Sequence, residues 1–202
     1  MPLWIWPFAA LFLGYLLGSI PFGMVLTRAF GAGDIRQIGS GNIGATNVLR
    51  TGRKGLAAAT LILDALKGVA AVLIARAMAS PSGSELELIA AAGAFFGHLY
   101  PVWLQFKGGK GVATLLGLCL ILDWRVGLIF ALVWLGGMAV SRISSVGGMV
   151  AAVSAPIAAY ALGSTHLSIL LLVLALAVLW KHEANIRRLL AGTEPRIGQK
   201  SA

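Results

Sequence analysis

Long apolar blocks separated by short polar stretches dominate this chain of 202 residues. A helix needs about 20 apolar residues to cross a hydrocarbon core of about 30 Å. Charged residues make up only 11% of the chain, against about 25% in soluble domains, so they cannot cover a surface exposed to water. We therefore predict an all-α, polytopic membrane helix bundle that forms one domain over residues 1–202. The apolar runs give seven candidate transmembrane helices: 3–27, 55–79, 86–106, 111–122, 126–141, 146–163 and 167–180.

The apolar run 111–122 is too short for a full crossing, because it covers only about 18 Å as a helix. It is either a shortened span or one arm of a re-entrant hairpin with 126–141. The chain then has seven transmembrane helices, or five plus a re-entrant hairpin. Both counts are odd, so both predict that the two ends of the chain lie on opposite sides of the membrane.

The lysines and arginines predict the orientation, because these residues favour the cytoplasmic side of short loops. If the N-terminus is outside and the C-terminus is cytoplasmic, thirteen of the sixteen basic residues lie inside. This placement accounts for the net charge of +9 as membrane topology, with no role for nucleic acid. The polar and glycine-rich segments lie in the same inner loops, so we expect the active site to face the cytoplasm.

The first of these segments, residues 39–47, combines glycines with hydrogen-bond donors and is followed by Arg50. Clustered glycines let successive backbone N–H groups turn toward one anion, and the arginine fork suits a phosphate. The segment also contains the G-x-G-x-x-G pattern, but no strand precedes it and a membrane span follows, which excludes a dinucleotide fold. A plain flexible turn would explain the glycines but not so many donors. The donor side chains are those of Ser40, Asn42, Thr46 and Asn47.

A second segment, Lys107-Gly108-Gly109-Lys110-Gly111, leads directly into an apolar run. It resembles a phosphate loop in composition but lacks the order and spacing of a Walker sequence. A positively charged inner turn that obeys the topology rule would explain the two lysines alone. We predict a binding loop, since that rule does not account for three glycines.

A third cluster, residues 182–189, follows the last apolar run and contains His182 and Asn185, which share a face of a helix. Histidine can act as a base or donate to phosphate near neutral pH. The alternative is an amphipathic helix whose arginines contact anionic lipid head groups. Deeper in the chain, Asp64 and Lys67 are spaced for either a buried ion pair or a functional role in the membrane.

The residues also disfavour several kinds of chemistry. The acidic residues are too few and too scattered for a carboxylate-held metal site, so we expect neither a metal nor another cofactor. Cys119 lies within an apolar run, far from the basic loops, and no Ser-His-Asp set can be assembled on one side of the membrane. Covalent catalysis therefore has no good candidate residue.

The three clusters resemble the bacterial membrane glycerol-3-phosphate acyltransferases of the PlsY family. The similar stretches are 39–50 (GSGNIGATNVLR), 97–114 (GHLYPVWLQFKGGKGVAT) and 181–192 (KHEANIRRLLAG), with 14–23 (GYLLGSIPFG) and 64–68 (DALKG) in addition. The resemblance implies a compact seven-helix fold in the bacterial cytoplasmic (inner) membrane. It also implies transfer of an acyl group from acyl-phosphate to the 1-hydroxyl of sn-glycerol 3-phosphate. The products would be lysophosphatidic acid and inorganic phosphate, in the first step of phospholipid synthesis.

The same resemblance assigns roles to residues. The residues expected to contact glycerol 3-phosphate, and to form the catalytic set, are His182, Asn185, Lys110 and Arg50. The residues expected to bind substrate phosphate are Ser40, Gly41, Asn42, Gly44, Thr46, Asn47, Lys107, Gly108, Gly109 and Ser145. The assignment of Ser145 is less direct, because the residues after it depart from the serine-richer pattern of the family. The implied partners are glycerol 3-phosphate, acyl-phosphate and the lipid bilayer, with no obligate protein partner.

Two other classes of protein would also place basic loops at a membrane surface. A transporter of organic phosphate needs polar groups through the midplane and usually an internal repeat, whereas only Asp64 and Lys67 lie deep and no repeat is found. A lipid-binding scaffold has no need of glycine-rich phosphate loops. Turnover in detergent, where no membrane compartments exist, separates an enzyme from both.

Overall fold

The computed structural model describes residues 5–78 and 84–197, and within these ranges every regular element is a helix and no strand occurs. This confirms the predicted all-α class. The chain divides into two compact units, Met1–Leu122 and Asp123–Ala202. The predicted single domain over 1–202 stays a prediction.

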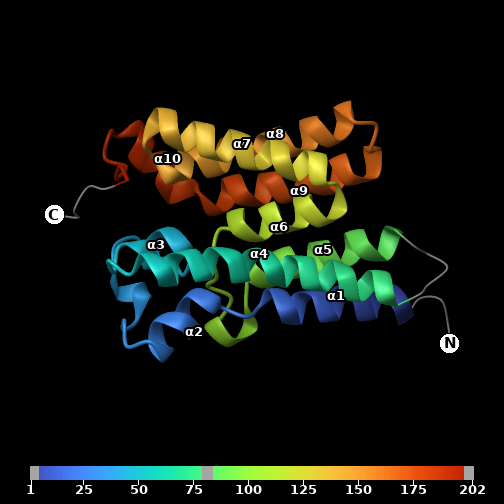
Figure 1. Cartoon of the computed structure of the whole chain (residues 1–202), viewed down its shortest axis with the longest axis horizontal. Coiled ribbons are helices and arrows are strands. Elements are labelled where there is room, and N and C mark those ends of the chain that lie inside the picture. The colour runs from blue at the N-terminus through green and yellow to red at the C-terminus, as the bar shows by residue number, and fades with distance from the viewer. Residues whose placement is uncertain (1–4, 79–83, 198–202) are drawn as a thin grey trace. The chain divides into compact units, whose positions relative to one another are not determined.

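The first unit is built around the long helix α4 (Lys54–Ala77), which packs against α1 (Ile5–Gly18), α5 (Ser84–Leu99) and α6 (Val112–Leu122). Figure 1 shows α1 and α5 lying along the C-terminal part of α4. At the end of the unit opposite the start of α1 lie the shorter elements. They are α2 (Phe22–Ala29), the 3-10 turn η1 (Ile35–Gln37) and α3 (Ala45–Leu49). A second 3-10 turn, η2 (Val102–Leu104), follows α5.

The predicted span 3–27 is one apolar run but two helices, because α1 ends at Gly18 and α2 begins at Phe22. Pro21 lies in the break, where it has no N–H to donate and its ring opposes a continuous helix. Carbonyls freed by such a break must be satisfied by the protein, since lipid offers no donors. Trp103 Nε1 donates to the Ser19 carbonyl over 2.6 Å, and Lys67 Nζ donates to the Ile20 carbonyl over 2.8 Å.

Glycines bring α1 and α5 close together. A Cβ atom on Gly14 or Gly18 would collide with the backbone of Ala90 or Ala94 on α5. The fit is reciprocal, because a Cβ on Gly93 would meet the backbone of α1 in the same way. Small residues are the usual means of close helix packing in membranes, where lipid removes most of the hydrophobic driving force.

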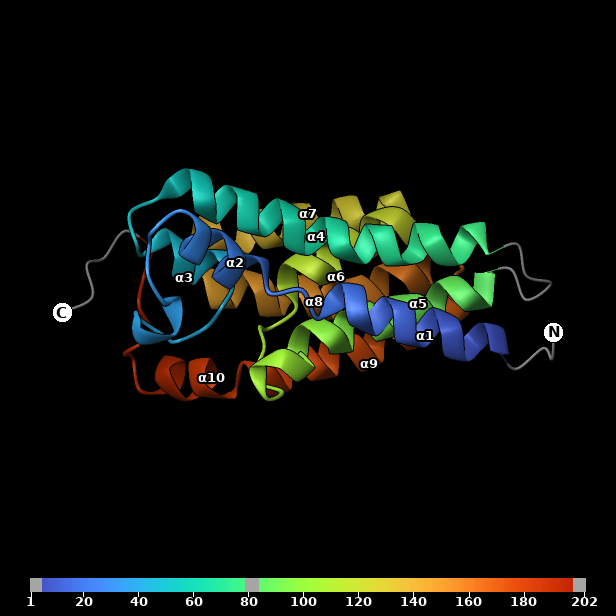
Figure 2. The same ribbon diagram turned by 90° about the horizontal axis from the view of Figure 1, so that it is seen from below.

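The second unit contains α7 (Trp124–Ser141), α8 (Ser144–Ala161), α9 (Thr165–Lys181) and α10 (Glu183–Leu190). Helix α8 packs against both α7 and α9. Its contact face is rich in small residues, and Gly147 lies against the backbone of α7 at Trp134. Figure 2 shows α10 leaving the end of α9 in a new direction, and the bend between the two helices is 58°.

Among the described residues, five segments are long and apolar enough to cross a membrane: Ile5–Ala29, Lys54–Ala77, Glu85–Leu104, Trp124–Ser141 and Ser144–Ala161. A sixth is obtained if α9 and the bent-away α10 count as one span. Helix α6 has 11 residues and covers about 16 Å, so it is the short apolar segment that the sequence indicated. The multi-span character is confirmed, whereas the count of seven and the N-out orientation stay predictions.

We expect Gly18→Val to destabilise the first unit, because the new side chain forces α1 away from the backbone of Ala94. Overpacking of this kind costs about 1–3 kcal/mol in the free energy of unfolding. Thermal unfolding of the purified protein in detergent measures the change. Gly55→Ala is the matched control, since no heavy atom lies within 4 Å of the added Cβ. Equal stability of the two variants would contradict the close packing.

Candidate anion-binding site

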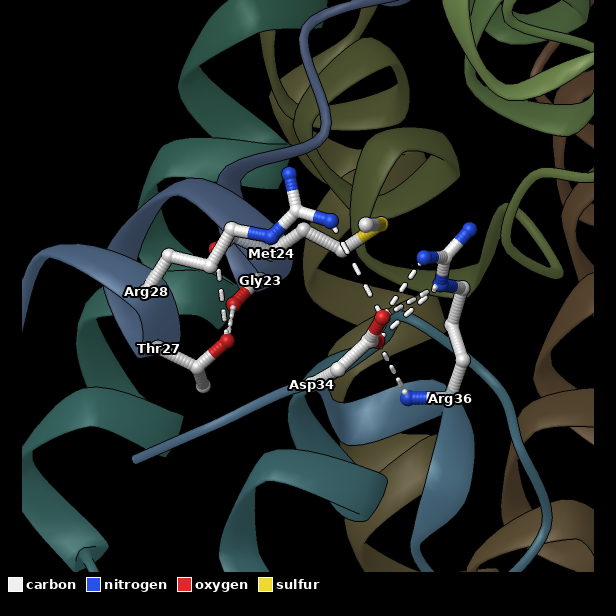
Figure 3. A network of polar contacts seen from close by, with 6 residues as sticks. All are labelled: Gly23, Met24, Thr27, Arg28, Asp34 and Arg36. Atoms are coloured by element: carbon white, nitrogen blue, oxygen red, sulfur yellow. Dashed lines mark hydrogen bonds and ion pairs between the residues drawn. The ribbon is translucent and has the colours of Figure 1, made fainter. Parts of the chain in front are cut away.

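An ion pair between Asp34 and Arg36 lies just before the first glycine-rich loop, residues 39–47. The Asp34 side chain caps η1 by accepting from the backbone N–H of Arg36 over 3.0 Å, and it also pairs with the Arg36 guanidinium. Arg28 Nη2, from the end of α2, lies 3.8 Å from the same carboxylate. Figure 3 shows both arginines around Asp34, with Thr27 donating back to the Gly23 carbonyl within α2. Hydrogen bonds from Arg36 lower the pKa of Asp34 to about 2, so the carboxylate stays charged at neutral pH.

Asn47 holds the loop together from inside. Its side chain is buried, and its Nδ2 donates to the Ile35 carbonyl over 2.7 Å. Its Oδ1 accepts from the Ser40 backbone N–H over 3.3 Å and from Arg50 Nη1 over 3.4 Å. The sequence predicted Asn47 as a donor to phosphate, but its polar atoms here bond to Ser40 within the loop and to Ile35 and Arg50 on either side of it. Its contact with a phosphate therefore stays a prediction, whereas its role in shaping the loop is plain from these bonds.

The same bonds place Arg50 beside Gly39. A Cβ atom on Gly39 would lie 2.7 Å from Arg50 Cδ, and the φ angle of this glycine is 53°, in the left-handed region. Glycine is therefore required here for both conformation and space. The structure thus brings Ser40 and Arg50 together around Asn47, and both Ser40 and Arg50 are exposed.

In the second glycine-rich loop, two backbone amides bond to the end of α5. The Gly108 N–H donates to the Leu99 carbonyl over 3.1 Å, and the Gly109 N–H donates to the His98 carbonyl over 3.0 Å. Both amides therefore satisfy the C-terminal end of α5. A Cβ on Gly109 would strike the His98 ring, and one on Gly111, whose φ is 85°, would strike the Phe95 ring.

The glycines of this loop therefore allow it to pack closely on α5. The cationic groups of the loop are its two lysines. Lys107 is exposed and Lys110 is half-buried. Phosphate binding by Gly108 and Gly109 stays a prediction, and contact through these two N–H groups would require the amides to leave the end of α5. The sequence could not distinguish close packing from anion binding, because both use the absence of a side chain.

In the second unit, His182 lies at the junction between α9 and α10 and is buried. Its Nδ1 is 2.8 Å from the Val178 carbonyl, which can only accept, so Nδ1 carries a proton. In the neutral imidazole Nε2 is then the acceptor nitrogen. Asn185 is also buried, one turn further along the chain.

Glu194 links Ser145 and Asn185, two of the three site residues predicted in this unit. Its Oε1 accepts from Ser145 Oγ over 2.6 Å and from Asn185 Nδ2 over 2.5 Å, while Oε2 accepts from Arg188 Nε over 2.7 Å. Only 6% of the Glu194 side chain is exposed. Sequence reasoning missed this residue, because a carboxylate is not expected among groups assigned to bind phosphate. The available signal was that Glu194 is the one acidic residue after Glu183.

The backbone after α10 places Glu194 by turning back on the helix. Gly192, with φ of 70°, allows the Thr193 N–H to reach the Arg188 carbonyl over 2.8 Å, the bonding pattern of a Schellman cap. Further along, the Ile197 N–H donates to the Arg142 carbonyl over 2.7 Å at the end of α7. Ser145 is the second residue of α8, where the helix dipole favours a negative charge.

The family model described as glycerol-3-phosphate acyltransferase matches residues 8–192. The chain belongs to the glycerol-3-phosphate acyltransferase family. A glycerol-3-phosphate acyltransferase of Mesorhizobium japonicum is 61% identical over 191 residues, which cover 95% of this chain and 96% of the relative. One from Rhodopseudomonas palustris strain BisB5 is 58% identical over 192 residues, with the same two coverages.

Solved structures of the acyltransferase family agree with the fold. The crystal structure of PlsY, an integral membrane glycerol 3-phosphate acyltransferase, in its glycerol 3-phosphate form superposes with a TM-score of 0.88. It is 37% identical and covers 95% of this chain and 96% of that one. The lysophosphatidic acid form gives a TM-score of 0.85 at 35% identity. The resemblance that the sequence indicated is therefore confirmed, and the chain is an integral membrane protein of this acyltransferase family.

We expect Glu194→Gln to lower both stability and activity, because it leaves Arg188 without its charged partner and removes one of two acceptor oxygens. Partial burial raises the pKa of Glu194, but the hydrogen bonds from Ser145, Asn185 and Arg188 outweigh it and lower the pKa overall. The stabilisation is thus complete above the ordinary glutamate pKa of 4.5 and is lost as the pH falls through the lowered value.

Thermal unfolding measured between pH 7 and pH 3 tests this prediction. The Tm of wild type should fall with pH, and the part of that fall that Glu194 causes should be absent in Glu194→Gln. Glu183→Gln is the matched control. Glu183 carries the same charge on α10, but its ion pair with Arg187 is exposed and worth little. Identical pH profiles for wild type and Glu194→Gln would contradict the charged network.

Proposed function

We propose that this protein transfers an acyl group from acyl-phosphate to the 1-hydroxyl of sn-glycerol 3-phosphate. The products are lysophosphatidic acid and inorganic phosphate, and the reaction is the first step of phospholipid synthesis at the cytoplasmic face of the bacterial inner membrane. Family membership supports the acceptor, since the solved PlsY structures are described in glycerol 3-phosphate and lysophosphatidic acid forms. The choice of acyl-phosphate as donor rests on the resemblance to the PlsY family, and the chemistry of this donor is consistent with it.

The observation that carries the proposal is a pair of basic, glycine-rich loops in a membrane protein of this family. Acceptor and donor both carry phosphate, so two anion-binding segments are needed. The only cysteine, Cys119, is fully buried in α6 and cannot act as a nucleophile on the donor. Acyl-phosphate is a mixed anhydride with a good leaving group, so it reacts with a hydroxyl without an enzyme nucleophile.

The proposed roles follow the chemistry of each side chain. Arg50 and Lys110 contact the phosphate of glycerol 3-phosphate, since both are cations and Arg50 lies exposed beside Ser40. Asn185 and His182 contact the same substrate. The first loop holds the donor phosphate through the side chains of Ser40, Asn42 and Thr46 and through the backbone of Gly41 and Gly44. Asn47 acts mainly by holding that loop in shape.

In the proposed reaction the 1-hydroxyl oxygen attacks the carbonyl carbon of the acyl-phosphate. A new carbon–oxygen bond forms, and the bond from that carbon to the phosphate oxygen breaks. The phosphate leaves with the electron pair, and basic side chains stabilise its developing charge. The hydroxyl proton passes to His182 or to a substrate phosphate oxygen. Nε2 is the acceptor nitrogen of the neutral His182 ring, because Nδ1 donates to Val178.

The reaction is tested with purified protein in detergent, labelled glycerol 3-phosphate and palmitoyl-phosphate. We expect lysophosphatidate from palmitoyl-phosphate and none from palmitoyl-CoA. Arg50→Ala and Lys110→Ala should each lower kcat/KM by about a hundredfold or more, because each removes a charge-assisted contact to phosphate. Arg125→Ala is a matched control, since this exposed arginine in the first turn of α7 pairs with Asp123 and belongs to none of the predicted site segments. If well-folded protein makes no product from any donor, the enzymatic proposal fails and uptake of organic phosphate into liposomes becomes the next assay.

Direct transfer also predicts that no acyl group becomes attached to the protein. Incubation with radiolabelled palmitoyl-phosphate in the absence of glycerol 3-phosphate, followed by acid quench and mass spectrometry, should give the unmodified mass. A protein mass increased by one palmitoyl group, at a residue whose substitution abolishes turnover, would establish a covalent intermediate and refute direct transfer.

A further inference from the structure

Three ionisable side chains form a buried cluster in the first unit that the proposed mechanism does not use. Asp64 and Lys67 lie near the middle of α4 and His98 lies at the end of α5, and each residue is no more than 4% exposed. Lys67 Nζ is 2.7 Å from Asp64 Oδ1, and His98 Nδ1 is 3.7 Å from the same oxygen. Charged groups at this depth are costly and are usually tied to function.

One side of the cluster supports the first glycine-rich loop. Lys67 donates to the Ile20 carbonyl in the break that precedes α2. Three residues later, Gly23 of α2 lies so close to the Ile43 carbonyl that a Cβ atom would collide with it. Ile43 belongs to the loop formed by residues 39–47. The direction in which α2 leaves the break therefore determines where this loop lies.

The other side of the cluster supports the second loop. The His98 ring lies against the backbone of Gly109, and the His98 carbonyl accepts the Gly109 N–H. Asp64, beside Nδ1 of the same ring, limits how the imidazole can turn. Lys110 is the next residue, so its backbone begins at the point where the loop is fixed to His98.

We propose that Asp64, Lys67 and His98 are positioning residues that hold both glycine-rich loops in their binding arrangement through the Ile20 carbonyl and the Gly109 backbone. The inference rests on the proposed function in one respect, namely that these loops bind the phosphate groups of the substrates. It gives the buried Asp64–Lys67 pair a function, since a contribution to stability alone does not account for the pair. Replacing a buried ion pair with apolar residues is often neutral or stabilising, because the pair loses its hydration on burial.

The double variant Asp64→Asn, Lys67→Met tests the proposal, because it removes both charges together and leaves neither one buried alone. Its KM for glycerol 3-phosphate and for palmitoyl-phosphate should rise by about 10- to 100-fold, as expected when reacting groups are misplaced by about an ångström. The matched control is Arg76→Gln, Glu87→Gln. This double variant removes the ion pair that joins the other ends of α4 and α5, where Arg76 Nη2 is 2.8 Å from Glu87 Oε2. Its KM values should stay within about twofold of wild type, since exposed pairs contribute little and neither glycine-rich loop adjoins these ends of α4 and α5.

Gly109→Ala provides a second route that leaves every charge in place. The new methyl group collides with the His98 ring and displaces the loop, so the KM for glycerol 3-phosphate should again rise. Gly136→Ala on α7, where nothing lies within 4 Å of the added Cβ, should match wild type. This pair of variants decides the question if the Asp64 and Lys67 double variant does not fold.

Thermal stabilisation by glycerol 3-phosphate gives a readout that needs no turnover and no donor. Wild type and both control variants should show a rise in Tm with added glycerol 3-phosphate, and the positioning variants should show much less. If wild type is stabilised but makes no product from acyl-phosphate, the proposed donor is wrong while this inference survives. If the positioning variants keep wild-type KM values and the full Tm shift, the inference is overturned while the proposed reaction stands.

Discussion

The need to satisfy backbone carbonyls inside a membrane organises the first unit. Helix α1 stops before Pro21 and α5 stops before Pro101, so carbonyl groups of both helices lack partners within the helix. Lipid supplies no donors, and each unsatisfied group would cost several kcal/mol. Lys67 and Trp103 satisfy the first break, and backbone amides of the second glycine-rich loop satisfy the end of α5. The polar segments proposed to bind substrate are thus held by the same bonds that make the broken helices possible.

The sequence predicted most of the helices, because apolar length is a strong signal in a chain with so few charges. The predicted run 55–79 became α4 (Lys54–Ala77), and the short run 111–122 became α6 (Val112–Leu122). The break at Pro21 was missed because apolar residues continue on both sides of it. Apolar runs indicate which segments contact lipid. They do not indicate where the backbone hydrogen bonding of a helix is interrupted.

The candidate site was predicted less completely than the fold. Residue types identified the basic loops, and the structure places Ser40 and Arg50 around Asn47 as one cluster. Residue types alone could not show that the amides of Gly108 and Gly109 bond to α5, because close packing and anion binding both favour glycine. Glu194 was missed for a related reason. A carboxylate acts here as an internal partner for Ser145, Asn185 and Arg188, which no pattern of charge along the chain indicates.

Carboxylates that pair with arginines near the predicted site also affect how strongly the site can hold anions. Asp34 is paired with Arg36 beside the first loop, and Glu194 is paired with Arg188 beside Asn185, so part of the basic charge is neutralised before any substrate arrives. In the proposed reaction the acceptor, the donor, the product and the leaving group are all anions. Donors that bind all of them equally would increase affinity without accelerating the chemical step. In the proposed reaction, the internal pairing of these arginines would leave fewer cations to bind anions strongly, which would favour release of inorganic phosphate and lysophosphatidate.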